Sequence, residues 1–151
     1  DALHDPEVRV LQIRFNLLDW RWKKRGVDEA TRLRPDVTIH ARSPLLQGLL
    51  ASANAAHWPK TPGIEAQAIV ARLERIVQRL GRESLLDLAL AYVRSHPWIH
   101  GIVTGFATAA QLVEAVRLFE LPLLAAHEIE WIEAERGVYP VELLDPARWR
   151  A

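Results

Sequence analysis

Three short runs rich in β-branched residues, set among longer segments of helical periodicity, restrict the fold of this chain more than any other feature. The runs cover residues 8–13, 37–42 and 99–104. Strands that alternate with helices are typical of parallel β/α units joined by right-handed crossovers. The sequence therefore predicts an α/β protein whose strands lie parallel in one sheet.

The segments between the runs are predicted from apolar spacing and from residues that begin or end helices. Ile69, Leu73, Ile76 and Leu80 follow helical spacing, and Gly81 is favourable just after a helix end. Helices are expected over residues 28–34, 64–80, 108–119 and 125–137, and over a segment from Glu83 or Ser84 to just before Pro97. Residues 15–22, 43–50, 51–63 and 139–151 are expected to be loops or irregular.

The charge balance narrows the class of partner. Lys and Arg number 19, as do Asp and Glu, so the formal net charge is zero. This balance disfavours nucleic acid or an anionic membrane surface as a partner. No apolar run has a membrane-spanning length, and no signal-peptide pattern opens the chain. We therefore expect a cytoplasmic protein that binds a small molecule.

The first residue of the chain and the number of predicted strands bear on whether the sequence holds a whole domain. The sequence begins at Asp1 and contains no methionine, so we expect it to be part of a longer translation product. Three parallel strands also leave two hydrogen-bonding edges open. We therefore expect further strands elsewhere, and self-association of the isolated chain through the open edges.

The segment 99–114 combines a predicted strand, a turn of small residues and the start of a helix. Gly105 permits close backbone approach or a positive φ, and Thr108 is a candidate N-cap. The positive end of the helix dipole at such a turn can hold an anion, most often a phosphate. The alternative is a purely structural turn, because many strand-to-helix connections need a glycine and a capping residue.

Four sequence blocks carry a resemblance to a known family. They are LQIRFNLLD at 11–19, ARSPLLQGLL at 41–50, LALAYV at 88–93 and GFATAAQLVE at 105–114. Together they resemble the C-terminal half of an aldo/keto reductase, a TIM-barrel family that reduces carbonyls with a nicotinamide cofactor. The resemblance implies one partial domain over residues 1–151, holding the last three strands of a (β/α)8 barrel, an extra C-terminal helix and a tail. It further implies that an N-terminal half precedes Asp1.

The same resemblance implies which residues bind NADP or NAD. Gln12 would bond to the nicotinamide carboxamide, and Arg42 would stack on the nicotinamide ring. Ser43, Leu45, Gln47 and Gly48 would line the pyrophosphate, while Gly105, Thr108, Gln111 and Glu114 would surround the adenosine. The chain departs from the family pattern at Phe106, Ala107 and Ala115, where a basic residue and an asparagine often favour the 2′-phosphate of NADP.

Each of these residues also has a structural interpretation. Gln12 can cap neighbouring backbone groups, and Arg42 can pair with a carboxylate. Gln111 and Glu114 can be solvated side chains on a helix. Trp20, Trp22 and Trp149 can either wall a substrate pocket or cover the surface; they are spread over two segments of the chain.

Catalytic residues are not expected in this chain. Carbonyl reduction needs a proton donor, usually a tyrosine whose pKa a nearby lysine lowers. Neither tyrosine, Tyr92 or Tyr139, has a lysine at suitable spacing, since the lysines are Lys23, Lys24 and Lys60. The resemblance places the catalytic Tyr, Lys, Asp and His in the N-terminal half, so the chain alone is predicted to be inactive. His40, His57 and His100 lack metal-ligand spacing relative to one another, and no metal site is expected.

Two functions remain open at this stage. The first is part of an NAD(P)H-dependent aldo/keto reductase that reduces a small aldehyde or ketone, with the N-terminal half as its partner. The second is a non-catalytic domain of the same architecture that serves in binding or assembly. The departures at Phe106, Ala107 and Ala115 keep the second function open.

Overall fold

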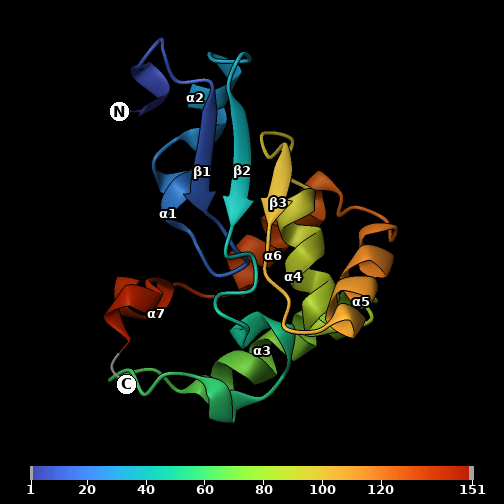
Figure 1. Ribbon diagram of the computed structural model, residues 1–151. Helices are drawn as coiled ribbons and strands as arrows, with labels where there is room; N and C mark the ends of the chain where they lie inside the picture. Colours follow the sequence, from blue (N-terminus) through green and yellow to red (C-terminus); the bar gives the residue numbers. More distant parts are fainter. Residues whose placement is uncertain (1, 150–151) are drawn as a thin grey trace.

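The computed structural model describes residues 2–149 and contains one parallel sheet. Its strands are β1 (Val10–Arg14), β2 (Thr38–Arg42) and β3 (Gly101–Val103), in the order β1-β2-β3. The arrows of all three strands run in the same direction in Figure 1. The predicted alternation of parallel strands and helices is therefore confirmed, although β1 and β3 each begin two residues later than expected.

Helices fill the connections between the strands. They are α1 (Arg21–Lys24), α2 (Val27–Arg32), α3 (Ala66–Arg79), α4 (Leu85–Arg94), α5 (Ala109–Phe119), α6 (Ala126–Glu135) and α7 (Val141–Leu144). Short 3-10 turns cover Ala2–His4, Leu49–Ala51, Ala55–His57 and Pro146–Arg148. Among the helices of residues 2–149, none combines the length and the apolar composition needed to cross a bilayer. The longer helices agree with their sequence-based predictions to within two or three residues at each end.

Two short helices correct those predictions. Helix α1 begins inside the expected loop 15–22, and α7 lies in the tail expected to be irregular. Each has four residues, which is too short for apolar periodicity to show in the sequence. The loop before α1 is apolar because it is part of the core, where Leu17 and Leu18 are fully buried.

The two faces of the sheet have different surroundings. Ile39 and Ala41 of β2 are fully buried and belong to the main core. Helix α4 packs beside β3 and is buried along almost its whole length. On the other face, Val10 and Val103 are 58% and 44% exposed, an unusual state for valines in a sheet. The described elements therefore cover one face of the sheet and leave the opposite face open.

Candidate functional site

A groove of about 900 Å³ lies between the loop after β2 and the turn after β3. Both segments follow the carboxyl ends of parallel strands, where barrel and open-sheet proteins place their ligands. The groove is lined by Arg42, Ser43, Pro44, Leu45, Gln47, Gly48, Ala51, Leu86, Val103, Thr104, Gly105, Phe106, Ala107, Ala110, Gln111 and Glu114. Eight of the ten residues that the sequence singled out for cofactor binding therefore share one groove; the exceptions are Gln12 and Thr108.

The loop after β2 has an unusual backbone. Ser43, Leu46 and Gln47 have φ values of 58°, 45° and 56°, and Gly48 has 88°. For residues other than glycine, this left-handed conformation costs roughly 1–2 kcal/mol each. Hydrogen bonds inside the loop offset that cost, including Leu46 N–H to Ser43 O at 3.1 Å and Gly48 N–H to Leu45 O at 2.9 Å.

The side chains of this loop anchor it further. Leu46 is 1% exposed, and Leu49 and Leu50, just after the loop, are also buried in the main core. Gln47 and Gly48 are exposed at the groove. Backbone strain of this kind persists only where the surroundings hold it, and it is common at ligand sites. The buried leucines and the internal hydrogen bonds therefore hold the loop in this strained conformation.

Unbonded backbone N–H groups lie on both walls of the groove. Within residues 2–149, the N–H groups of Leu45, Gln47, Gly105 and Phe106 donate to no backbone or side-chain acceptor. Helix α5 also begins just beyond the turn after β3. N–H groups in turns and at helix starts attract phosphate oxygens. The donor set thus suits an anionic group such as a pyrophosphate.

The backbone at Gly105 is not in the left-handed conformation that favours glycine. It is absent from the positive-φ glycines, so that part of the expectation for this residue is wrong. A Cβ atom built at Gly105 would meet no described atom within 4 Å. The remaining reason for a glycine is the other one that the sequence offered, close approach of the backbone to a bound group.

A capping box closes the start of α5, as the N-cap prediction for Thr108 required. The Thr108 hydroxyl accepts a hydrogen bond from Gln111 N–H at 3.2 Å, and Gln111 Oε1 accepts from Ala107 N–H at 2.8 Å. Thr108 therefore lies beside the groove without lining it. Gln111 lines the groove with its carbonyl oxygen already engaged and can offer only its amide N–H groups to a ligand.

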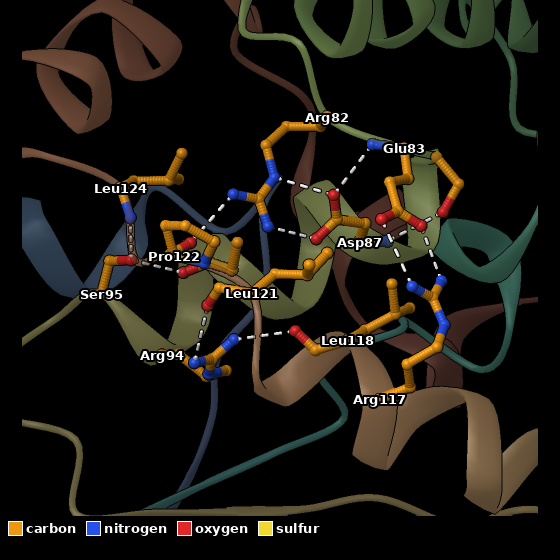
Figure 2. Close-up of polar contacts among 12 residues, drawn as sticks. Arg82, Glu83, Asp87, Arg94, Ser95, Arg117, Leu118, Leu121, Pro122 and Leu124 are labelled. Atoms are coloured by element: carbon orange, nitrogen blue, oxygen red, sulfur yellow. Dashed lines mark hydrogen bonds and ion pairs between the residues drawn. The ribbon is translucent and has the colours of Figure 1, made fainter.

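Polar contacts between α4 and its neighbours hold α5 against the groove (Figure 2). Arg94 donates to Leu118 O at 3.0 Å and to Leu121 O at 3.3 Å, at the end of α5 and just beyond it. Arg117 of α5 bonds both to Glu114 and to Glu83, which precedes α4. The Arg117 contact lowers the pKa of Glu114 below its usual value. Glu114 is thus an ionised residue with a cationic partner on its own helix.

A buried ion pair anchors the start of α4 in the same view (Figure 2). Asp87 is 1% exposed and bonds to Arg82, while Arg82 also donates to Pro122 O at 2.9 Å. Asp87 further accepts from Glu83 N–H at 2.9 Å. These bonds tie the α3–α4 turn to the connection between α5 and α6. These contacts therefore hold the C-terminal end of α5 to α4.

Gln12 and Arg42 occupy the next hollow along the sheet. Gln12 is exposed on the open face of β1, in register with His40, and lines a hollow that is separate from the groove. Arg42 lines both spaces. In the described part of the chain its guanidinium has no carboxylate or hydrogen-bond partner, so the structural interpretation of Arg42 as half of an ion pair does not hold.

The tyrosines lie away from the groove. Tyr92 donates to Glu133 at 3.0 Å and accepts from Arg136 at 3.1 Å, and burial raises the pKa of Tyr92. Burial also raises the pKa of Tyr139, whose hydroxyl donates to Arg136 O at 2.6 Å. A proton donor in carbonyl reduction needs the opposite shift. Among residues 2–149, neither hydroxyl has a lysine partner.

The structure places the three candidate tryptophans in different surroundings. Trp20 and Trp149 donate to the carbonyls of Tyr139 and Leu143, both at 3.0 Å, and thus cover the tail and core. Trp22 lines the hollow that contains Gln12. No group of His, Asp and Glu side chains in the described residues has metal-binding geometry. Leu86 and Ala51 line the groove but are not predicted from the sequence, because each lies just outside a motif block, Ala51 directly after 41–50 and Leu86 two residues before 88–93.

Comparison with known proteins identifies the family of this chain. The sequence profile of the aldo/keto reductase family matches residues 3–135. The chain belongs to the aldo/keto reductase family. Members of this family are NAD(P)H-dependent oxidoreductases. A search of curated protein sequences finds no significant match.

Solved aldo-keto reductase structures share the fold of the chain. In its apo form, aldo-keto reductase AKR11C1 from Bacillus halodurans is 21% identical, with a TM-score of 0.66, over 97% of this chain and 49% of its own length. Its holo form matches equally, over 48% of that chain. The thermostable aldo-keto reductase Tm1743, solved with the inhibitor epalrestat, is 20% identical over 85% of this chain and 39% of its own length, with a TM-score of 0.60. The chain thus spans about half the length of these proteins, as a fragment of a TIM barrel.

The residues present fit a nicotinamide dinucleotide in one part of the groove better than in another. The unbonded N–H groups of Leu45, Gln47, Gly105 and Phe106 suit a pyrophosphate. The end of the groove where the sequence predicts the adenosine carries Ala107, while Ala115 is buried at 2% exposure against α4 and cannot reach a ligand. The groove therefore fits a pyrophosphate well. Among the described residues, it offers no positively charged residue where a 2′-phosphate is expected.

Proposed function

We propose that the chain is the C-terminal, cofactor-binding half of an NAD(P)H-dependent aldo/keto reductase that reduces a small aldehyde or ketone. The catalytic Tyr, Lys, Asp and His belong to the N-terminal half in this proposal. One observation carries it: a preset groove at the carboxyl ends of β2 and β3 presents unbonded N–H groups from both of its walls. The match to the family profile supports it.

The residues of the chain have separate roles in this proposal. Ser43, Leu45, Gln47 and Gly48 hold the pyrophosphate, mainly through backbone N–H groups. Arg42 stacks on the nicotinamide and Gln12 bonds to its carboxamide, while Gly105, Thr108, Gln111 and Glu114 surround the adenosine. When bound, the cofactor supplies the hydride for the carbonyl carbon. The part of this chain is to orient the dinucleotide.

The adenosine end favours NADH over NADPH in this proposal. Ala107 has no charge, and Arg117 of α5 is already held by Glu114 and Glu83. A 2′-phosphate at this end would therefore approach Glu114 without a free cation to offset its charge. We expect NADH to bind at least as tightly as NADPH.

Titration of the chain with NADH, followed by cofactor fluorescence, tests the binding site. Arg42→Ala and Gln12→Ala each remove one contact to the nicotinamide end and should weaken binding several-fold, since a hydrogen bond or stacked pair contributes about 1 kcal/mol. Arg32→Ala is the matched control, because Arg32 is exposed on α2 and lines neither space. Unchanged affinity in both test variants would contradict the proposed roles.

A non-catalytic domain for binding or assembly is the second candidate function. The observation that favours it is the departure from the family pattern at the turn after β3, where Phe106 and Ala107 line the groove without charge and Ala115 is buried. The two functions differ in the residues encoded before Asp1. A preceding barrel half with Asp, Tyr, Lys and His at its strand ends, and carbonyl-dependent oxidation of NADH by the longer protein, would support the reductase.

Self-association follows from the open sheet. The outer edges of β1 and β3 have no strand partner among the described residues, and unpaired edges recruit further strands. Sedimentation velocity of the isolated chain should therefore show dimers or larger species. A single monomeric species at high protein concentration would contradict this expectation.

A further inference from the structure

A second hollow, of about 300 Å³, lies beside the groove at the carboxyl end of β1. We call it the Arg25 pocket. Its lining is Gln12, Ile13, Arg14, Arg21, Trp22, Arg25 and Arg42. Four of these residues are arginines, and none is acidic. Its volume is at the lower end of the range for small-molecule sites, about 300–1,000 Å³.

Two of the four arginines have carboxylate partners behind the pocket wall. Arg21 binds the buried carboxylate of Asp19 through two bonds, at 2.8 and 2.6 Å. Arg14 pairs with Asp145. These two carboxylates hold the guanidinium groups in place and offset their charge, so an excess of positive charge in the pocket must come from Arg25 and Arg42.

The other two arginines have no carboxylate partner within residues 2–149. Arg42 has neither an ion pair nor a hydrogen bond from its side chain, and Arg25 packs only on the Trp22 ring, 5.6 Å from its centroid. The Trp22 indole in turn donates to the backbone carbonyl of Arg14, so the ring is fixed to the end of β1. The pocket therefore has an excess of positive charge on a preformed wall.

Guanidinium groups repel one another unless an anion lies between them. Their planar donor geometry matches carboxylate and phosphate oxygens, and such charge-assisted bonds are stronger than neutral ones. The Gln12 amide adds a neutral donor to the same wall. The charge and geometry of the pocket are therefore those of an oxyanion site.

We propose that the Arg25 pocket binds a carboxylate or phosphate group carried by the carbonyl substrate. This inference rests on the proposed function, which places the nicotinamide beside Gln12 and Arg42, both of which line the pocket. An oxyanion held there lies next to the reacting end of the cofactor. The substrate class is then an anionic aldehyde or ketone, such as a keto acid or a phosphorylated aldehyde, rather than a neutral one.

Calorimetric titration of the chain with three small probes tests this assignment. Benzoate and phenyl phosphate carry the two candidate oxyanions, and benzamide is the neutral counterpart of benzoate. We expect at least one of the anions to bind and benzamide to show no binding, and the tighter anion identifies the group. Equal binding of benzoate and benzamide, or no binding of either anion, overturns the proposal.

Charge variants at Arg25 test the location. Arg25→Glu should weaken anion binding about tenfold or more, and Arg25→Lys should restore part of it. Arg32→Glu is the matched control, since it makes the same change of charge at an exposed arginine outside the pocket. Equal losses in Arg25→Glu and Arg32→Glu would mean that only the overall charge matters, which overturns the proposal.

Cofactor titration of the same variants separates this inference from the proposed function. Arg25 does not line the groove, so Arg25→Glu should leave NADH affinity within about twofold. Loss of NADPH but not NADH affinity would show that the pocket serves the phosphate of the cofactor, and would overturn the substrate assignment. If the chain binds NADH but neither anion, only this inference is overturned. If it binds an anion but no cofactor, the proposed function is overturned.

Discussion

The two walls of the groove reach a fixed geometry by opposite means. The loop after β2 holds Ser43, Leu46 and Gln47 in left-handed backbone conformations and is anchored by buried leucines. The turn after β3 has no positive φ at Gly105 and is stabilised by the capping box of α5 and by the ion pairs around α4. A ligand site can thus combine a strained wall with a relaxed one. Four substitutions test this difference, from the largest expected effect to the smallest.

Asp87→Ala should have the largest effect, because it removes one partner of the buried Arg82 pair that supports the relaxed wall. Breaking such a pair leaves a buried, uncompensated guanidinium and costs about 3–5 kcal/mol in unfolding free energy. Urea denaturation measures the loss. Glu142→Ala, which removes an exposed pair with Arg148, is the control and should cost less than about 1 kcal/mol. Similar losses of unfolding free energy in the two variants would contradict a stabilising role for the buried pair.

Thr108→Ala should cost about 1 kcal/mol, since it removes the N-cap of α5. Thr108→Ser keeps a hydroxyl acceptor and should retain most of the stability. Thermal unfolding followed by circular dichroism compares the three proteins. If Thr108→Ala unfolds at the wild-type temperature, the capping box does not stabilise this wall.

Gln47→Gly should stabilise the free protein by roughly 0.5–1 kcal/mol, because relief of the left-handed strain exceeds the entropy that glycine adds to the unfolded chain. Gln47→Ala keeps the strain and should show no gain. Denaturant unfolding of both variants measures the difference. A loss of stability in Gln47→Gly would mean that the loop is not strained at this residue.

Glu114→Gln should have the smallest effect on stability, because Glu114 and its partner Arg117 are both exposed and solvent screens their attraction. Arg117 lowers the pKa of Glu114, so the folded state binds fewer protons there than the unfolded state does. The contribution of the pair is therefore complete above the unfolded pKa of about 4.5 and is lost as pH falls through the lower folded pKa. Side-chain NMR titration should give a Glu114 midpoint below 4.5 in the wild type and a higher one in Arg117→Ala.

Much of the fold was predictable because it depends on neighbouring residues. The β-branched runs and the spacing of Ile69, Leu73 and Ile76 indicated the alternation of strands and helices. Thr108 was recognisable as an N-cap for the same reason, because its partner is Gln111, three residues ahead. The short helices α1 and α7 were missed, since four residues carry no measurable period.

The candidate site was predictable only in part. The motif blocks at 41–50 and 105–114 indicated the residues of the groove, and the structure brings them together from two strand ends. The separation of Gln12 from the groove, and its place in the Arg25 pocket, had no sequence signal. The bond from Ala107 N–H to the Gln111 side chain was not predicted, although a threonine followed three residues later by a glutamine is the signature of a capping box.

The sequence alone determined the parallel α/β architecture, the family and the capping of α5. Only the tertiary structure decided that Leu46 and Gln47 adopt left-handed backbones and that four arginines converge on one hollow. The physical reason is the range of the interactions. Periodicity and capping depend on residues a few positions apart, whereas backbone strain and converging charges are set by packing between residues distant in the chain.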